Sequence, residues 1–365
     1  MKLFFWPIET SSREFQYKVD LAKKLECTNS LHIFARPWTL SYLALFCSKV
    51  NWIGQNVNHK FRINKKKLSS IIVKKGGRVF YFDEEGGFYY PEELAEKVLK
   101  HRYSNINPTE LHHVFSWGST QNKILSKMGF NCSDVGHPRF DKVPKETDRD
   151  DNFKNILIMT NFSLILSEKN FLNEFDDEYF PRRKAESIKD LAKLIMFISQ
   201  QSKKKLLIRP HPSEDLMLYK KLFQHFDNVQ VLEREPLKNA LKRASKVYHF
   251  NCSTALDALT SGIETYNLSS GNSTIIKDLP TSLRQEINSE WLSFPSKKLQ
   301  ILDVISNQSV TRRSELKVWW VNILINFLEL SYGLRSLIKG TYEQEKFGDM
   351  KSLNNGKTYH VIKAK

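Results

Sequence analysis

The sequence predicts an α/β protein built from two Rossmann-like, doubly wound domains that face a central cleft. Short apolar runs alternate with helical patterns almost from end to end, which is typical of parallel sheets with crossover helices. The alternation is broken once, at residues 142–155, where the chain is polar, charged and aperiodic like an interdomain linker. A chain of 365 residues is long enough for two such domains.

Before the linker, each candidate strand is followed by a candidate helix. The expected strands are 2–8, 30–35, 78–83 and 112–118, and the expected helices are 12–26, 38–50, 91–103 and 119–129. Pro91 suits the first turn of its helix, and Gly129 suits the end of the last one. Residues 1–145 are therefore expected to form an N-terminal Rossmann-like domain.

The same pattern restarts after the linker. The expected strands are 156–162, 204–210, 228–233, 246–251 and 263–269, and the expected helices are 182–202, 215–226, 236–245 and 253–262. We expect residues 146–310 to form the second Rossmann-like domain and residues 311–365 to form a basic helical segment and tail. Because such sheets bind ligands at the carboxyl ends of their strands, the turns that follow the strands are the places to look for a site.

The composition argues against several classes of protein. The four cysteines are Cys27, Cys47, Cys132 and Cys252. Without CxxC spacing they indicate neither a zinc ribbon nor a disulfide framework, and they fit a reducing cytoplasm. The apolar run at the N-terminus is too short for a signal peptide, and no stretch approaches the roughly 20 apolar residues of a membrane span. We therefore expect a soluble or peripheral cytoplasmic protein.

The net charge of +16 favours an anionic partner: nucleic acid, a phosphorylated small molecule or an acidic membrane face. A lysine-rich, solvated surface would give the same charge without any partner. The chain has no recognised RNA or DNA motif, and its aromatic residues are not interleaved with lysines in one patch, so specific nucleic-acid binding is not expected. The basic pair at 312–313 and the apolar segment 318–330 make the C-terminal part a candidate for contact with an anionic membrane.

The segment LIRPHPSED, residues 207–215, places a cation and a histidine at the end of an apolar strand. Two prolines fix the backbone on either side of His211. Ser213 is expected to cap the helix that begins near Asp215, so that Arg209, His211 and free helix amides form a phosphate site. The alternative is a structural turn whose histidine is bonded to backbone.

The segment VYHFNCSTALDALTSG, residues 247–262, brings Asn251, Ser253 and Thr254 to a second strand-to-helix turn. Hydroxyl and amide groups at a helix start can hold a phosphate, although an ordinary cap is the commoner use. Both turns should open on the same side of a parallel sheet. Together they predict a phosphate clamp.

The segment FYFDEEGG, residues 80–87, concentrates three acids at the end of a strand. Carboxylates gathered in this way suit a general base or a nucleophile, since each raises the others' cost of ionising. A solvated acidic turn is the alternative.

A fourth segment, DVGHPRFDKV at 134–143, immediately precedes the linker and so lies where the cleft is expected. Arg139 and Asp141 could face a ligand from there. The alternative is a hinge whose glycine and proline are purely structural. None of the four segments has the spacing of a metal site, so no metal centre is expected.

Five stretches of the sequence, taken in order, resemble the bacterial surface carbohydrate biosynthesis proteins. They are FFWPIETSSREFQYKVDLAKKL, DEEG, VGHPRFD, RPHPSED and NCSTALDALTSG, and the resemblance runs from residue 1 to about residue 300. That group is similar to the retaining β-Kdo transferases and, more distantly, to the CDP-glycerol glycerophosphotransferases. The resemblance implies a GT-B architecture whose C-terminal domain binds a nucleotide-sugar. His137 departs from the group's GNPRFD pattern, which has asparagine there.

The motifs and the resemblance together assign roles to individual residues. The residues expected to bind the donor nucleotide are Arg139, Arg209, His211, Ser213, Asn251, Ser253 and Thr254, and the candidates for the catalytic carboxylate are Glu84, Glu85 and Asp141. The N-terminal domain is then the acceptor side. No metal and no cofactor besides the donor is required, because the basic groups can neutralise the departing phosphate.

The expected function is that of a glycosyltransferase of capsule, O-antigen or lipopolysaccharide synthesis. It would move a sugar such as Kdo from a CMP- or other cytidine-linked donor to a glycan or lipid-linked acceptor. One alternative is a polyol-phosphate transferase that uses a CDP-glycerol or CDP-ribitol type of donor. The other is a basic nucleic-acid-binding protein. The expected location is the cytoplasm, at the inner face of the membrane if the tail binds anionic lipid.

Overall fold

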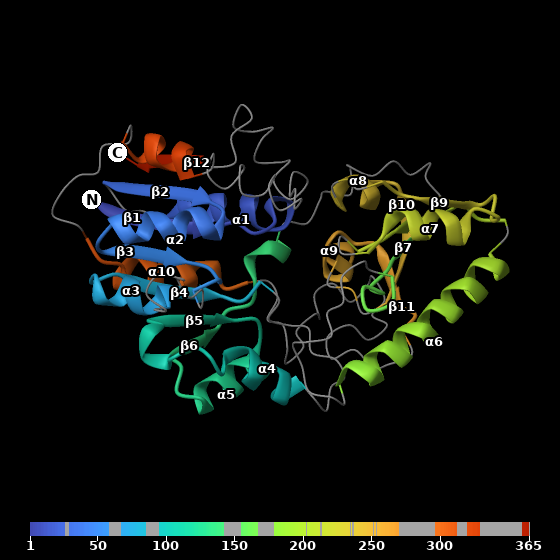
Figure 1. Cartoon of the computed structure of the whole chain (residues 1–365), viewed down its shortest axis with the longest axis horizontal. Coiled ribbons are helices and arrows are strands. Elements are labelled where there is room, and N and C mark those ends of the chain that lie inside the picture. Colours follow the sequence, from blue (N-terminus) through green and yellow to red (C-terminus); the bar gives the residue numbers. More distant parts are fainter. Residues whose placement is uncertain are drawn as a thin grey trace. The chain divides into compact units, whose positions relative to one another are not determined.

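The structure is a computed structural model of the chain, and it contains two compact units, each with its own sheet (Figure 1). The described residues are 1–25, 29–57, 67–84, 95–141, 155–166, 179–201, 203–211, 214–233, 235, 237–250, 252, 254–269, 296–311, 320–328 and 360–364. Unit 1 comprises Met1–Gly86, Glu96–Arg139 and Glu290–Lys365, and unit 2 comprises Gly87–Ala95 and Phe140–Ser289.

The sheet of unit 1 has seven strands in the order β12-β2-β1-β3-β4-β5-β6. Their bounds are β1 Lys2–Pro7, β2 Ser30–Ala35, β3 Val50–Ile53, β4 Arg78–Phe82, β5 His113–Ser116, β6 Cys132–Asp134 and β12 His360–Ala364. The first six pair in parallel, whereas β12 adds to β2 in the antiparallel direction. The strand order reverses between β1 and β3, so the loops after these two strands flank the topological switch point of this sheet.

Helices α1 to α5 and α10 also belong to unit 1. Their bounds are α1 Ser11–Lys24, α2 Pro37–Phe46, α3 Leu68–Lys74, α4 Ala95–Tyr103, α5 Ser119–Lys127 and α10 Lys298–Gln308. One core cluster joins Phe4, Trp6 and Phe80 of the sheet to Phe15 of α1 and Ile305 of α10. Eight of the cluster's buried residues are Phe, Tyr or Trp, so aromatic side chains supply a large part of this core.

Three strands of this sheet, β3, β6 and β12, were not among the expected elements. Residues 311–365 were expected to be a basic helical segment and tail, and for residues 360–364 that is wrong, because they form β12 and pair with β2. The sequence pattern runs the second helix to Val50, but α2 ends at Phe46 and Lys49 turns the chain with a φ of 54°. The four residues of β3 are all buried, so they show no alternation that would separate them from the apolar helix before them. The three residues of β6 include no large apolar side chain.

Residues 296–311 belong to unit 1, although the sequence analysis places residues up to 310 in the second domain. Ile301 and Ile305 of α10 are fully buried in the core cluster of unit 1. The side chain of Asn51 on β3 holds the end of the segment: its Nδ2 donates to the Val310 carbonyl at 2.9 Å, and its Oδ1 accepts from the Val310 amide at 2.7 Å. At the other end, the Lys297 amide donates to the carbonyl of Val135.

The sheet of unit 2 has five parallel strands in the order β11-β10-β7-β8-β9. The bounds are β7 Asn155–Met159, β8 Leu206–Arg209, β9 Val229–Val231, β10 Ala244–His249 and β11 Glu264–Asn267, with helices α6 Tyr179–Gln200, α7 Leu216–Phe223, α8 Leu237–Lys242 and α9 Thr254–Thr260. This is a doubly wound order that starts at β7 and reverses between β7 and β10. The two predicted Rossmann-like sheets are thus confirmed.

The start of α7 differs from the expectation that Ser213 caps it. Asp215 is the N-cap residue, and its Oδ1 accepts from the amides of Met217 at 2.7 Å and Leu218 at 3.4 Å. Aspartate is among the best N-cap residues because its carboxylate satisfies amides that have no partner within the helix. Ser213 lies outside the described residues.

We expect Asp215→Ala to lower the free energy of unfolding of unit 2 by about 1 kcal/mol, because two helix amides lose their acceptor. Chemical denaturation followed by circular dichroism would measure the loss. Asp215→Asn is the matched control and should retain most of the stability, since asparagine caps nearly as well. Equal losses for the two variants would contradict a capping role.

None of the described helices has the length and apolar character needed to cross a membrane. The segment with residues 320–328 is helical, as expected for the region of Trp320. Val321 and Ile325 are buried, whereas Trp320, Ile323 and Phe327 are exposed.

Candidate functional site

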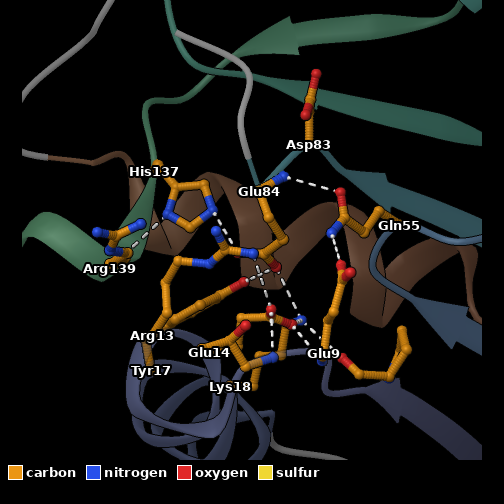
Figure 2. Close-up of polar contacts among 12 residues, drawn as sticks. Glu9, Arg13, Glu14, Tyr17, Lys18, Gln55, Asp83, Glu84, His137 and Arg139 are labelled. Atoms are coloured by element: carbon orange, nitrogen blue, oxygen red, sulfur yellow. Dashed lines mark hydrogen bonds and ion pairs between the residues drawn. The ribbon is translucent and has the colours of Figure 1, made fainter. Parts of the chain in front are cut away.

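A buried charged cluster lies where strands β1, β4 and β6 of unit 1 end, and Glu84 is at its centre (Figure 2). Glu84 follows β4 by two residues, and its side chain is fully buried. Lys18 Nζ lies 2.8 Å from its Oε1, Tyr17 Oη donates to the same oxygen at 2.5 Å, and His137 Nε2 lies 3.4 Å from its Oε2. This predicted catalytic residue is therefore closely surrounded by partners.

Lys18 is the main cation of the cluster. It comes from α1, is 1% exposed, and bonds Glu14 Oε2, Glu84 Oε1 and the Pro7 carbonyl, each at 2.8 Å. Burial lowers the pKa of this lysine, but Glu14 and Glu84 outweigh burial and hold the pKa above its ordinary value. Lys18 therefore stays charged.

Glu14 anchors the start of α1 to the loop after β1. Its carboxylate accepts from the backbone amides of Glu9 at 3.2 Å and Thr10 at 3.0 Å and pairs with Arg13 Nη2 at 3.2 Å. Gln55, in the loop after β3, donates to Glu9 Oε2 at 3.0 Å. The two loops at the switch point of the first sheet are thus joined through side chains, as Figure 2 shows.

The pKa of Glu84 corrects one expectation. Burial raises the pKa of this carboxyl, but the charge of Lys18 and the contact with His137 outweigh burial and bring it well below its usual range. The acids of this turn were expected to raise one another's cost of ionising, but for Glu84 the cation Lys18 and the contact with His137 decide the net direction of the pKa. An ionised, buried carboxylate suits a nucleophile or an electrostatic stabiliser better than a general acid.

The neighbouring Asp83 points to a different set of partners. Its carboxylate binds Arg102 Nη1 at 3.2 Å, Tyr103 Oη at 3.3 Å and Gln121 Nε2 at 3.4 Å. Its carbonyl accepts from the indole of Trp117 at 2.5 Å. Asp83 thus ties α4 and α5 to the end of β4. Glu85, the third acid of the turn, lies outside the described residues.

The GHPRFD segment contributes His137 to the same cluster. Gly136 has a φ of 71°, and the chain then places the His137 ring 5.0 Å from the Tyr17 ring and 4.9 Å from that of Trp117. The Arg139 amide donates to His137 Nδ1 at 3.2 Å, so Arg139 lies beside the cluster in unit 1. Asp141 ends the short 3-10 helix η3, Pro138–Asp141, and is half-buried.

In unit 2, four residues form a row at the carboxyl ends of adjacent strands. Asn267 of β11 is in register with His249 of β10, His249 with Met159 of β7, and Met159 with Arg209 of β8. Register neighbours in a parallel sheet share a face, so the four side chains leave the sheet on the same side. The row crosses the switch point between β7 and β10, where doubly wound sheets bind ligands.

Thr254, the first residue of α9, is close to this row. Its Oγ1 lies 3.1 Å from Met159 Sδ and 2.9 Å from the thiol of Cys252. The carboxylate of Asp257 on α9 acts electrostatically on Arg209, so α9 and the end of β8 are linked. Predicted donor-binding residues Arg209 and Thr254 are thereby brought to one edge of one sheet. Asn251 and Ser253 lie outside the described residues.

Arg209 is half-buried. Its Nη2 donates to the Glu235 carbonyl at 3.5 Å, whereas its buried Nε has no hydrogen bond to a described residue. Burial lowers the pKa of the guanidinium. An anionic ligand would therefore stabilise the charged guanidinium of Arg209.

The RPHPSED turn is organised by Glu214, which the sequence analysis did not single out. The buried carboxylate accepts from Thr160 Oγ1 at 2.6 Å, the His211 amide at 2.7 Å and Tyr219 Oη at 2.9 Å, and also from the Phe162 amide. It therefore holds together the loops that follow the adjacent strands β7 and β8.

The expected phosphate site at α7 is wrong in one part. Asp215 occupies the amides of Met217 and Leu218, and its negative charge lies where an anion would have to bind. His211 is half-buried beside this helix start. The carboxylates of Glu214 and Asp215 thus hold this turn together. Arg209, at the end of β8, is the cation that can attract an anion here.

Sequence reasoning also missed Glu14, Tyr17, Lys18 and His249. The i, i+4 spacing of Glu14 and Lys18 on the buried side of α1, beside Phe15 and Leu21, was the signal available for the first cluster. His249 is fully buried, and neither ring nitrogen bonds a described residue. Burial lowers its pKa to about 3, so the imidazole is neutral. Within the described ranges, no cluster of three or more histidine, cysteine or acidic residues could hold a metal ion.

No protein-family model matches the chain, and no curated protein does. Among solved structures, the MnaA protein of S. aureus with UDP is similar with a TM-score of 0.51 and 10% identity, covering 87% of this chain and 100% of its own. UDP-GlcNAc 2-epimerase of Methanocaldococcus jannaschii gives a TM-score of 0.48 and 10% identity, covering 86% of this chain and 93% of its own. The putative UDP-N-acetylglucosamine 2-epimerase of Listeria monocytogenes gives a TM-score of 0.47 and 11% identity, covering 94% of this chain and 98% of its own. With its two doubly wound sheets and the likeness to MnaA, the chain has a GT-B type fold.

Proposed function

We propose that the protein is a nucleotide-sugar-dependent glycosyltransferase whose donor nucleotide binds at the switch point of unit 2. The observation that carries this proposal is the row at that edge, where Arg209 and Thr254 flank the end of β7. A half-buried guanidinium with a free Nε suits a phosphate, which accepts several hydrogen bonds at once. The UDP named with MnaA, which shares the fold, supports a nucleotide as the ligand.

The acids of unit 1 would then act on the transferred sugar or the acceptor. Glu84 is kept ionised by Lys18, which fits a carboxylate that attacks or stabilises a positively charged sugar centre. Glu85, and Asp141 in the range of unit 2, remain the other proposed carboxylates. Arg139, which lies beside His137, stays a proposed ligand of the donor's phosphate on the strength of its sequence motif. No metal is required in this scheme, because the basic groups take over charge neutralisation.

The finer proposal comes from the resemblance of the motifs. The donor would be CMP-linked Kdo or a similar cytidine-linked sugar, and the acceptor a glycan or lipid-linked glycan of a surface polysaccharide, in the cytoplasm. A polyol-phosphate transferase with a CDP-linked donor would use the same nucleotide half. The two differ in the centre under attack, which is a sugar carbon in one and a phosphorus in the other.

We expect a cytidine nucleotide to raise the melting temperature of the protein, and Arg209→Met to abolish most of the shift. A ligand at 100 times its Kd stabilises a protein by about 2.7 kcal/mol, which is measurable in a thermal-shift assay with CMP, CDP and UDP. Loss of a charge-assisted phosphate contact should weaken binding by about 10- to 100-fold. Lys246→Met is the matched control: this exposed cation pairs with Glu264 on the same sheet but precedes the strand ends.

If no nucleotide raises the melting temperature of the wild-type protein, the proposal fails. If nucleotides bind, incubation with CMP-Kdo, CDP-glycerol and UDP-GlcNAc in separate reactions identifies the donor by its consumption. Consumption of UDP-GlcNAc without an acceptor would replace transfer by epimerisation or hydrolysis.

A further inference from the structure

The outer face of α6 and α7 in unit 2 carries an unusual number of exposed apolar side chains. Six large ones are between 36% and 61% exposed: Ile188, Ile195, Met196, Met217, Leu218 and Leu222. Leu194 and Ile198 of α6 pack in the same core cluster as Tyr219 and Phe223 of α7, so the two helices cover one face of the sheet. Their outward sides therefore form one layer of the surface, which we name the α6–α7 face.

The charged residues of this face are of one sign. Lys184, Lys189 and Lys193 of α6 and Lys221 of α7 are exposed. The acids on these helices are less exposed than the lysines. Asp190 is buried and accepts from Ser269 Oγ at 2.8 Å, and Glu186 is only partly exposed. Among the described side chains of α6 and α7, every exposed charge is thus a lysine.

We propose that the α6–α7 face docks on an anionic lipid surface. Helices that lie at a membrane interface combine an apolar face with a polar face rich in lysine and arginine. The lysines attract the headgroups of anionic lipids, and the apolar side chains enter the boundary between headgroups and acyl chains. This docking is independent of the proposed transferase activity, and it uses a surface distinct from the C-terminal segment to which the sequence analysis assigned membrane contact.

A second copy of the chain fits this face less well. In a two-fold symmetric dimer the same patch meets itself, so lysines of one copy would approach lysines of the other. Like charges that face each other across an interface are unfavourable. An anionic bilayer instead offers charge of the opposite sign and an apolar interior to the same side chains.

The experiment measures binding of the full-length protein to vesicles by flotation. We expect binding to vesicles of phosphatidylcholine mixed with phosphatidylglycerol, weaker binding as salt rises, and little binding to phosphatidylcholine alone. Lys189→Gln/Lys193→Gln should weaken binding by about 25-fold, since one lysine near such a surface is worth about 1 kcal/mol, or about 5-fold. Ile188→Ser/Met196→Ser/Leu222→Ser should weaken it by at least about 10-fold.

The matched control lies in unit 1. Trp320→Ser/Phe327→Ser removes two exposed apolar side chains from the helix at 320–328 and should leave binding unchanged. The proposal is overturned if the wild-type protein does not bind phosphatidylglycerol vesicles, if both α6–α7 variants bind as tightly as wild type, or if only the control variant loses binding. It is also overturned if sedimentation shows a dimer that the triple serine variant dissociates. Circular dichroism checks that each variant is folded. If the triple serine variant does not fold, the two-lysine variant still tests the proposal, because it is altered only at exposed positions.

Discussion

Lys18→Met is expected to lower the free energy of unfolding of unit 1 by about 3–5 kcal/mol at neutral pH. Methionine can fill much of the volume of the lysine chain, so the loss comes from charge rather than from a cavity. The variant leaves the carboxylates of Glu14 and Glu84 buried within reach of one another without their shared cation. Among the described side chains, Arg13 would still pair with Glu14, and the His137 ring would still contact Glu84.

The pH dependence follows from the pKa of Glu84. The folded protein holds this pKa well below the unfolded value of about 4.3, so its contribution to stability is complete above that value and is lost as pH falls through the folded pKa. In Lys18→Met the carboxyl loses its main cation and its pKa rises. The destabilisation should therefore be largest at neutral pH and shrink as the solution becomes acidic enough to protonate Glu84.

Tryptophan fluorescence during urea unfolding is the measurement, because all seven tryptophans fall within the ranges of unit 1. Lys100→Met is the matched control. Lys100 and Glu96 form an i, i+4 pair like Lys18 and Glu14, but both side chains are more than half exposed, so little change is expected. Lys18→Met/Glu84→Gln should recover part of the stability. A loss below about 1 kcal/mol for Lys18→Met would contradict a buried charge at this position.

The elements that could be predicted are those whose local pattern carries their own signal. Strands such as β1 and β7 are apolar runs followed by long amphipathic helices, and they were placed within a few residues. Strand β3 could not be found, because four fully buried residues after an apolar helix show no alternation. The return of α10 to unit 1 is decided by packing against residues some 300 positions earlier, which no local pattern records.

In the candidate site, too, some features could be predicted from local sequence and others could not. The strand ends and the residue types at Arg209 and Glu84 were visible in the motifs. What each carboxylate does depends on its partners. Asp215 caps its own helix, whereas Glu214 bonds Thr160 in the loop after β7 and Glu84 pairs with Lys18 of α1. These partners lie up to 66 residues apart, so the chemistry of the carboxylates could not be deduced from their own segments.

Ile305→Ala is expected to destabilise unit 1 by about 2–5 kcal/mol, because it removes a fully buried side chain from the core cluster and leaves a cavity. Leu299→Ala on the same helix is the control: Leu299 is 78% exposed, so its truncation should cost little.

The same pair of variants distinguishes two ways of dividing the chain. If α10 packed on the second domain, as the boundary at residue 310 would have it, Ile305→Ala would leave the unfolding of unit 1 unchanged. Because Asn51 and Val135 hold both ends of the segment against the first sheet, we expect the tryptophan-detected transition to move instead. Asn51→Ala should move it in the same direction, since the half-buried backbone groups of Val310 would lose both hydrogen bonds to the Asn51 side chain. A tryptophan transition unchanged in both variants would place the segment elsewhere.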